Sequence, residues 1–319
     1  MYPPRDLAKG GIEILKEDGL REFAVRGGYF GYEQMLKGLF TASGKASEGE
    51  NIYDEDWDAL IVLDGMRKDL LEETIDEFDF LGKDVESFDS LGSSSQEWMD
   101  RNFTDSRSDD LSETVMITGN AFSRTHLSED DFQHMEEVWK YAWDEEKKAV
   151  MPEPITDAAI HYGREHEPDR MIVHYMQPHY PFLEDLDIGC GVKPRTFGEV
   201  NVSKQPWDEL LLGDVSEEEL WAAYKDNLRY VMDEVRKLAE NLDAERTVIT
   251  ADHGNGMGKF TYDDLGVYGH QPGIAVNSLR DVPWIEMNAE DTEEYIPGDP
   301  QENSEYDRGE IMRALGYKE

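Results

Sequence analysis

Residues 57–64, WDALIVLD, contain the longest unbroken aliphatic run of the chain and end in an acidic residue. A short apolar run between polar residues is typical of a strand that is buried on both faces, as in a parallel sheet. Two further runs follow the same pattern, at residues 113–120 (ETVMITGN) and 170–176 (RMIVHYM). A fourth strand is predicted at residues 245–254 (ERTVITADHG), and residues 282–287 (VPWIEM) are a candidate fifth.

Helical patterns separate these strands. Helices are predicted at residues 67–78, from Ser128 to about residue 146, and from Thr156 to residue 161. Ser216 and Glu219 form a capping-box pattern that opens a long amphipathic helix ending near residue 242. Because strands and helices alternate, the predicted fold class is α/β, with a mostly parallel central sheet flanked by helices.

The length of the chain suits one large domain. We expect residues 1–50 to form an N-terminal helical extension and residues 51–319 to form one compact α/β domain. The polar residues 42–56 are typical of a linker between the two. Residues 188–214 have little periodicity, and we expect them to form a loop over the active face.

Acidic residues dominate the composition. The chain has 72 Asp and Glu against 31 Lys and Arg, which gives a net charge of −41. Its 7 Trp and 15 Tyr exclude a disordered acidic chain, which lacks such aromatic residues. The acids are spread along the sequence rather than gathered in a tail, as in the cytoplasmic proteins of salt-accumulating archaea. We therefore expect a halophilic protein, with an ordinary acidic protein as the alternative.

The same sequence excludes several partners and compartments. The single cysteine, Cys190, allows neither an internal disulfide nor a cysteine-based zinc site. The large negative charge disfavours nucleic acid as a partner. No apolar stretch reaches the roughly 20 residues that a membrane helix needs, and the first residues, MYPPRDLAKGG, lack the core of a signal peptide. We therefore expect no membrane segment and a cytoplasmic location.

Three polar side chains follow two of the predicted strands. Asp64 ends the first strand, and Asp252 and His253 follow the fourth. Because ligands gather beyond the carboxyl ends of parallel strands, we expect these residues to meet. Two carboxylates and one imidazole suit a divalent metal ion. Taken singly, a strand-terminal Asp is more often a turn residue or helix cap, and a lone histidine is more often structural.

A serine-rich segment, SLGSSSQEWM at residues 90–99, lies between the first two predicted strands. Such segments are commonly plain loops. However, a hydroxyl held against a metal ion can lose its proton and attack phosphorus. The segment is therefore also the candidate source of a nucleophile.

Several motifs resemble the alkaline phosphatase superfamily, especially its sulfatase-like branch. They are DALIVLDGMRKDLL (58–71), MITGN (116–120), HYMQPHYPF (174–182), TVITADHGNGMG (247–258), YGHQPG (268–273) and LRDVPWIEM (279–287). Together they span most of the chain. The resemblance implies a sulfatase-like hydrolytic domain, and with the acidic composition it indicates a haloarchaeal-type sulfatase-like hydrolase.

The resemblance also implies a metal site with a serine nucleophile. It implies that Asp64, Asp252 and His253 bind one divalent ion, and that the serine bridges this metal and the substrate. It places the nucleophile at Ser94, with Ser95 as the alternative because loop alignment is uncertain by one residue. Manganese, zinc and magnesium suit this ligand set, and calcium suits it less well.

Three other histidines match positions near the site in the family. His179 matches a histidine that contacts the transferred or leaving oxygen, and a surface loop histidine is the alternative. His270 matches a position that faces the substrate or a second metal, and a loop-stabilising residue is the alternative. His174 is a further candidate for the substrate or second metal, although its place inside a predicted strand favours a sheet residue near the site.

The serine segment departs from the sulfatase pattern. Sulfatases convert a Cys or Ser into an aldehyde within a motif that carries Pro and Arg, whereas residues 94–98 read SSQEW. The predicted activity is therefore metal-dependent hydrolysis or transfer of a phosphate ester, carried by a small molecule or glycan. A sulfatase that uses serine directly and a catalytically inactive binding protein of the same fold are the alternatives.

The acidic composition predicts a dependence on salt. At molar salt the Debye length is about 3 Å, so repulsion between the acids of the folded chain is screened. We expect the melting temperature and solubility to rise between low and molar potassium chloride. Thermal unfolding over that range tests this, and an unchanged melting temperature would count against the halophilic interpretation.

Overall fold

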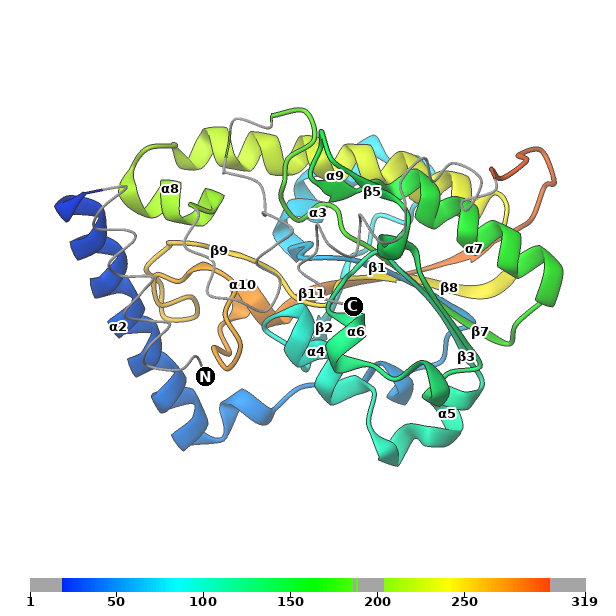
Figure 1. Ribbon diagram of the computed structural model, residues 1–319, viewed down its shortest axis with the longest axis horizontal. Helices are drawn as coiled ribbons and strands as arrows, with labels where there is room; N and C mark the ends of the chain where they lie inside the picture. Colours follow the sequence, from blue (N-terminus) through cyan, green and yellow to red (C-terminus); the bar gives the residue numbers. More distant parts are fainter. Residues whose placement is uncertain (1–18, 186–187, 189–203, 299–319) are drawn as a thin grey trace.

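A seven-stranded sheet forms the centre of the molecule (Figure 1), in the order β2-β11-β8-β1-β7-β3-β4. The computed structural model describes residues 19–185, 188 and 204–298, and Cys190 lies outside them. The strands are β1 (Ala59–Leu63), β2 (Glu86–Asp89), β3 (Thr114–Thr118), β4 (His134–Glu137), β7 (Arg170–Tyr175), β8 (Ala244–Thr250) and β11 (Asp281–Ala289). The five neighbouring strands β8, β1, β7, β3 and β4 pair in parallel. Strand β11 runs antiparallel to both of its neighbours, β8 and β2. The predicted α/β class with a mostly parallel sheet is confirmed.

The central strand β1 shows how the sequence produces this arrangement. All five of its residues are buried, and the strand has a parallel neighbour on each side. Apolar side chains are needed on both faces, so the strand reads as a continuous apolar run. Its register places Val62 opposite His174 of β7 and Thr250 of β8. The carboxyl ends of these three strands therefore meet at one edge of the sheet.

Helices cover both faces of the sheet. In Figure 1, α3 (Lys68–Thr74), α7 (Pro152–His166) and α9 (Glu217–Ala239) lie above it, and α4 (Ser95–Asn102), α5 (Ser108–Ser112) and α6 (Ser123–His126) lie below it. The predicted capping box of α9 is present: Ser216 Oγ accepts from Glu219 N at 3.2 Å, and the Glu219 carboxylate accepts from Ser216 N at 2.9 Å. The predicted apolar face of α9 is buried in the core, through Leu220, Tyr224, Leu228, Val231, Val235 and Leu238.

Shorter elements connect these layers. They are η1 (Lys45–Ser47), η2 (Ile52–Asp54), η3 (Ile75–Glu77), η4 (Asp105–Arg107), η5 (Glu129–Asp131), η6 (Val138–Lys140), β5 (Trp143–Asp144), β6 (Ala149–Val150), α8 (Pro206–Leu212), β9 (Gly256–Met257), β10 (Tyr268–Gly269) and α10 (Asn277–Arg280). In the part of the chain that is described, no helix is both long and apolar enough to cross a bilayer.

The helix predicted from Ser128 to residue 146 is wrong. This segment contains the edge strand β4, which pairs in parallel with β3. Alternate residues of β4, Met135 and Glu137, are buried, and the Glu137 carboxylate accepts from Ser123 Oγ at 2.8 Å. Pairing with the sheet and this buried contact override a pattern that reads as an amphipathic helix.

Two other boundaries differ from the prediction. The helix expected to begin at Thr156 begins at Pro152, whose fixed φ suits the first helical turn, and Thr156 lies inside it. Within the stretch predicted as a loop, α8 forms at Pro206–Leu212, where Gln205 and Asp208 make a capping box. Residues 189–203 of that stretch lie outside the described residues.

The N-terminal helix α2 (Leu20–Ser43), at the left of Figure 1, packs beside α8 and contacts β10 through Tyr29 and Tyr268. Tyr32 Oη donates to the Leu265 carbonyl at 2.6 Å, and the inner side of the helix contributes to a second apolar cluster. That cluster contains Leu36, Phe40, Val267, Ile274, Val276 and Leu279. The linker expected at residues 42–56 is not exposed throughout, because Ile52 and Tyr53 are buried in the main core. The division into residues 1–50 and 51–319 stays a prediction.

One acid on α2 predicts a pH-dependent stability. Burial raises the pKa of Glu33 from 4.5 to about 7, against the opposing effect of Lys37. Between these two pH values the folded chain keeps a proton on Glu33 that the unfolded chain loses. The contribution of this proton to the free energy of unfolding is therefore complete below pH 4.5 and is lost as the pH rises through 7. We expect Glu33→Gln to be about as stable as wild type at pH 4.5 and more stable by roughly 2–3 kcal/mol at pH 8.

Chemical unfolding in molar potassium chloride measures this difference. Glu290→Gln is a matched control, because it removes the same amount of charge at an exposed position. Stability curves of Glu33→Gln and wild type that stay parallel from pH 4.5 to 8 would contradict the prediction.

Candidate active site

Two carboxylates meet at the carboxyl edge of the sheet. Asp64 directly follows β1 and is 2% exposed, and Asp252 follows β8 and is fully buried. Asp252 Oδ1 accepts from the backbone amides of Gly65 and His253, each at 2.9 Å. Gly65 has φ 71°, a conformation that favours glycine, and this turn directs its amide toward Asp252. The turn after β1 therefore helps to hold the acid that follows β8.

Asp64 is held from a third strand. Its Oδ2 accepts from Asn120 Nδ2 at 2.9 Å, and Asn120 lies just beyond β3. The other carboxylate oxygens, Asp64 Oδ1 and Asp252 Oδ2, are buried and have no hydrogen-bond partner. Buried carboxylate oxygens without partners are costly, and a cation between them would supply the missing interaction.

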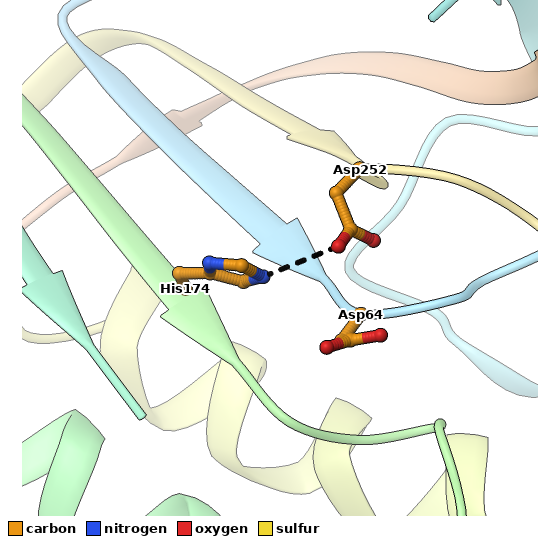
Figure 2. A group of neighbouring side chains, drawn as sticks. All are labelled: Asp64, His174 and Asp252. Atoms are coloured by element: carbon orange, nitrogen blue, oxygen red, sulfur yellow. Dashed lines mark ion pairs between the residues drawn. The ribbon is translucent and has the colours of Figure 1, made fainter. Parts of the chain in front are cut away.

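Two histidines flank these free oxygens. His253 Nε2 lies 3.6 Å from Asp64 Oδ1 and 3.6 Å from Asp252 Oδ2. His174 is fully buried in β7, and its Nε2 lies 3.7 Å from Asp252 Oδ2. Figure 2 shows Asp64, His174 and Asp252 converging from three neighbouring strands, with one ligand atom of each within 4.8 Å of the others. His174 is thus a sheet residue near the site, as predicted, and both of its ring nitrogens lack a hydrogen-bond partner.

The electrostatics of this group also favour a cation. Burial raises the pKa of Asp64, and the neighbouring Asp252 raises it further. Burial acts against ionised Asp252 as well, but His253, His174 and the Gly65 amide outweigh it and lower the pKa of Asp252. A divalent ion would remove the repulsion between the two carboxylates. The mixture of carboxylate and imidazole donors fits zinc or manganese, with magnesium as a harder alternative.

The serines occupy three different positions. Ser94 is the N-cap of α4, and its Oγ accepts from the Glu97 amide at 3.4 Å. Ser95 is the first residue of the helix, and its Oγ lies 3.3 Å from Asp64 Oδ2 and 3.4 Å from His253 Nε2. Ser93 Oγ contacts the Glu97 carboxylate instead. The hydroxyl beside the candidate metal ligands thus belongs to Ser95, whereas the sequence favoured Ser94.

Three histidine rings lie together beside the serine. The ring centroids of His253 and His270 are 4.4 Å apart, and those of His270 and His179 are 5.0 Å apart. Each Nδ1 is bound to an oxygen: His179 to the Tyr180 carbonyl, His253 to the Gly254 carbonyl and His270 to Asn255 Oδ1. Nδ1 must therefore carry the proton, which leaves a lone pair on each Nε2, as in metal-binding histidines.

His179 and His270 both remain partly accessible from outside. Loss of water around the rings lowers the pKa of His179, and it lowers that of His270 further below the usual range with help from His253. Both rings are therefore suited to accept a hydrogen bond or bind a cation rather than to donate a proton.

Sequence reasoning missed two amides that orient these groups. Asn120 donates to Asp64, and Asn255 accepts from His270 while its Nδ2 donates to the Gly65 carbonyl at 3.2 Å. Asn120 ends the MITGN motif and Asn255 follows the Asp-His-Gly element, so both stand directly beyond strands. Their position at the sheet edge was the available signal, although polar residues there are usually turn formers.

No family model matches the sequence, and no curated protein matches it. The fold does match solved structures. The chain is structurally similar to several of them at low sequence identity. One is the integral membrane lipooligosaccharide phosphoethanolamine transferase A from Neisseria meningitidis, with 13% identity, 82% of this chain and 51% of that chain covered, and a TM-score of 0.45. The chain thus spans about half the length of that transferase.

Two further matches have other activities or origins. One is BT1596, a 2-O GAG sulfatase, with 13% identity, 85% of this chain and 71% of that chain covered, and a TM-score of 0.45. Another is a protein of the alkaline phosphatase superfamily from Vibrio parahaemolyticus, with 10% identity, coverages of 81% and 69%, and a TM-score of 0.38. At these scores the similarity is one of general chain path.

The carboxylate pair predicts the effect of neutralising one acid. Asp252→Asn keeps the side-chain shape and removes a charge that a cation needs, so we expect bound metal to be lost while the fold is kept. The metal-free variant should still fold, but it should melt somewhat lower than metal-free wild type, because the contacts that lower the pKa of Asp252 stabilise its ionised form. Metal content by plasma mass spectrometry and thermal unfolding measure the two effects, with the exposed Asp226→Asn as a control. Full metal content in Asp252→Asn would contradict the assignment.

Proposed function

We propose that the protein is a metal-dependent hydrolase or transferase of phosphate esters, with Ser95 as its nucleophile. The observation that carries this proposal is the position of Ser95 Oγ, within 3.4 Å of both Asp64 and His253. Asp64, Asp252 and His253 would hold the metal, with His174 as a further donor at the same place. When bound, a divalent ion there would lower the pKa of a neighbouring hydroxyl and offset charge on phosphoryl oxygens.

The residues around Ser95 suit the first step of such a reaction. Ser95 Oγ attacks phosphorus, a bond from Oγ to phosphorus forms, and the bond from phosphorus to the ester oxygen breaks. Asp64 Oδ2, 3.3 Å from Ser95 Oγ, is within reach of the hydroxyl proton, and Asp64 Oδ1 and the His253 Nε2 lone pair are left for the cation. Ser95 also begins α4, where free backbone amides and the helix dipole favour negative charge on the transferred group. Water or an acceptor alcohol then releases the phosphoryl group from the serine.

His179 and His270 are proposed to act on the substrate side of the site. Their Nδ1 protons are fixed on oxygens, so each Nε2 offers a lone pair. In this state they can accept a proton or hydrogen bond from a water or an acceptor alcohol. The same lone pairs suit a second metal ion, which would place more positive charge beside the transferred group.

The ester type follows from the chemistry of the serine. A phosphorylated serine can be released by in-line attack, whereas a sulfated serine has no comparably easy exit. The segment around Ser95 lacks the Pro and Arg of the sulfatase maturation motif. Phosphate esters of small molecules or glycans are therefore the proposed substrates. A non-catalytic role is disfavoured, since two buried carboxylates with free oxygens are costly to keep without a ligand.

Paired serine variants test the proposal. We expect Ser95→Ala to lower turnover of aryl phosphate mono- or diesters by several orders of magnitude, because the covalent route is lost. Ser94→Ala removes only a long capping contact, so turnover should fall by about tenfold or less and stability by about 1 kcal/mol. Both variants are measured in molar salt with zinc or manganese.

The same kinetic measurements can contradict the assignment of the nucleophile and of the ester type. An active Ser95→Ala beside an inactive Ser94→Ala would return the nucleophile to Ser94. Aryl sulfate should be cleaved far more slowly than aryl phosphate by the wild-type protein. Faster cleavage of the sulfate would overturn the ester assignment.

A further inference from the structure

A single carboxylate beneath the serines receives hydrogen bonds from two separate loops. Glu97 lies in the first turn of α4 and is 9% exposed. Its Oε2 accepts from Ser93 N at 3.0 Å, from Ser93 Oγ at 2.7 Å and from Gly273 N at 3.2 Å. Three donors from segments 180 residues apart in the chain thus converge on one oxygen.

The opposite side of the carboxylate is paired with a cation. Glu97 Oε1 lies 2.5 Å from Arg101 one turn along the helix. Arg101 also donates to the Leu91 carbonyl at 2.8 Å, at the start of the serine segment. The charges of Glu97 and Arg101 therefore balance one another. Together the two side chains connect α4 to Ser93 and Leu91, in the segment that leads to Ser95.

Both loops held by Glu97 carry residues of the proposed site. Ser93 stands two residues before Ser95, and Gly273 stands three residues after His270. Ser93 Oγ makes a second connection, because it lies 3.0 Å from the Gln271 carbonyl and accepts from Gly273 N at 3.1 Å. Gln271 to Gly273 form no helix or strand, so such bonds fix where the loop lies.

We propose that Glu97 is a positioning residue, which fixes the Ser95 hydroxyl and the His270 ring relative to one another for phosphoryl transfer. The inference rests on the proposed function of Ser95 and His270. Glu97 itself contacts neither the candidate metal ligands nor Ser95 Oγ among the contacts of the described residues. Its effect passes through the two loops, and a displacement of about 1 Å between reacting groups can cost about a hundredfold in rate.

Glu97→Gln tests this with little change in volume. The amide has only one acceptor oxygen, so it cannot receive the three loop donors and also accept from Arg101. We expect kcat for aryl phosphate to fall about ten- to hundredfold, with KM changed much less and metal content unchanged. Asp100→Asn, on the exposed side of the same helix, is the matched control and should behave as wild type. If Glu97→Gln does not fold, Ser93→Ala removes one donor and should lower kcat severalfold.

A double-mutant cycle separates positioning from general stability. In a His270→Ala background, the loss caused by Glu97→Gln should shrink, because one of its two targets is gone. Hydrogen–deuterium exchange adds a readout without turnover: residues 90–95 and 268–276 should both exchange faster in the metal-free variant. Strictly additive losses, or an unchanged kcat, would overturn the inference. If instead Ser95→Ala stays active, the proposed function fails, whatever Glu97→Gln does.

Discussion

The structure depends on placing two carboxylates in one buried locus. Asp64 and Asp252 repel one another there, and each keeps one oxygen without a partner. The surroundings compensate in part, through the Gly65 and His253 amides, the Asn120 side chain and two histidines. What is left uncompensated is a concentration of negative charge beside the Ser95 hydroxyl. A cation would relieve the strain of the protein and activate the serine at the same time, so stability and proposed chemistry share one interaction.

Much of the fold could be read from the sequence, because buried parallel strands leave a continuous apolar signal. β1 is such a case, and the ends of parallel strands bring Asp64, Asp252 and His253 together by topology alone. The signal weakens at the edge of the sheet. Strand β4 alternates buried Met135 and Glu137 with more accessible residues in a segment rich in charge, and only its pairing with β3 decides its conformation. The exposed acidic surface gives no such pattern, and the halophilic interpretation stays a prediction.

Within the site, the sequence identified residue types better than exact positions. It favoured Ser94 over Ser95, but Ser94 caps α4 and Ser95, the first residue of the helix, lies beside Asp64. Similarly, Asn120, Asn255 and Glu97 act through contacts with partners far away in the chain. Such contacts follow neither the periodicity of a helix or strand nor a fixed spacing in the sequence. They become visible only when the strand ends and loops have been placed in space.

The topology of the site also has a consequence for how the chain is made. Its donors come from β1, β7 and β8, and the hydrogen bond from Gly65 to Asp252 spans 187 residues. During synthesis, Asp64 leaves the ribosome well before Asp252 and His253, which follow it by almost 190 residues. A chain that has not yet formed β8 therefore lacks the combined donor set. A cation that needs all of these donors would bind only after β8 has paired with β1.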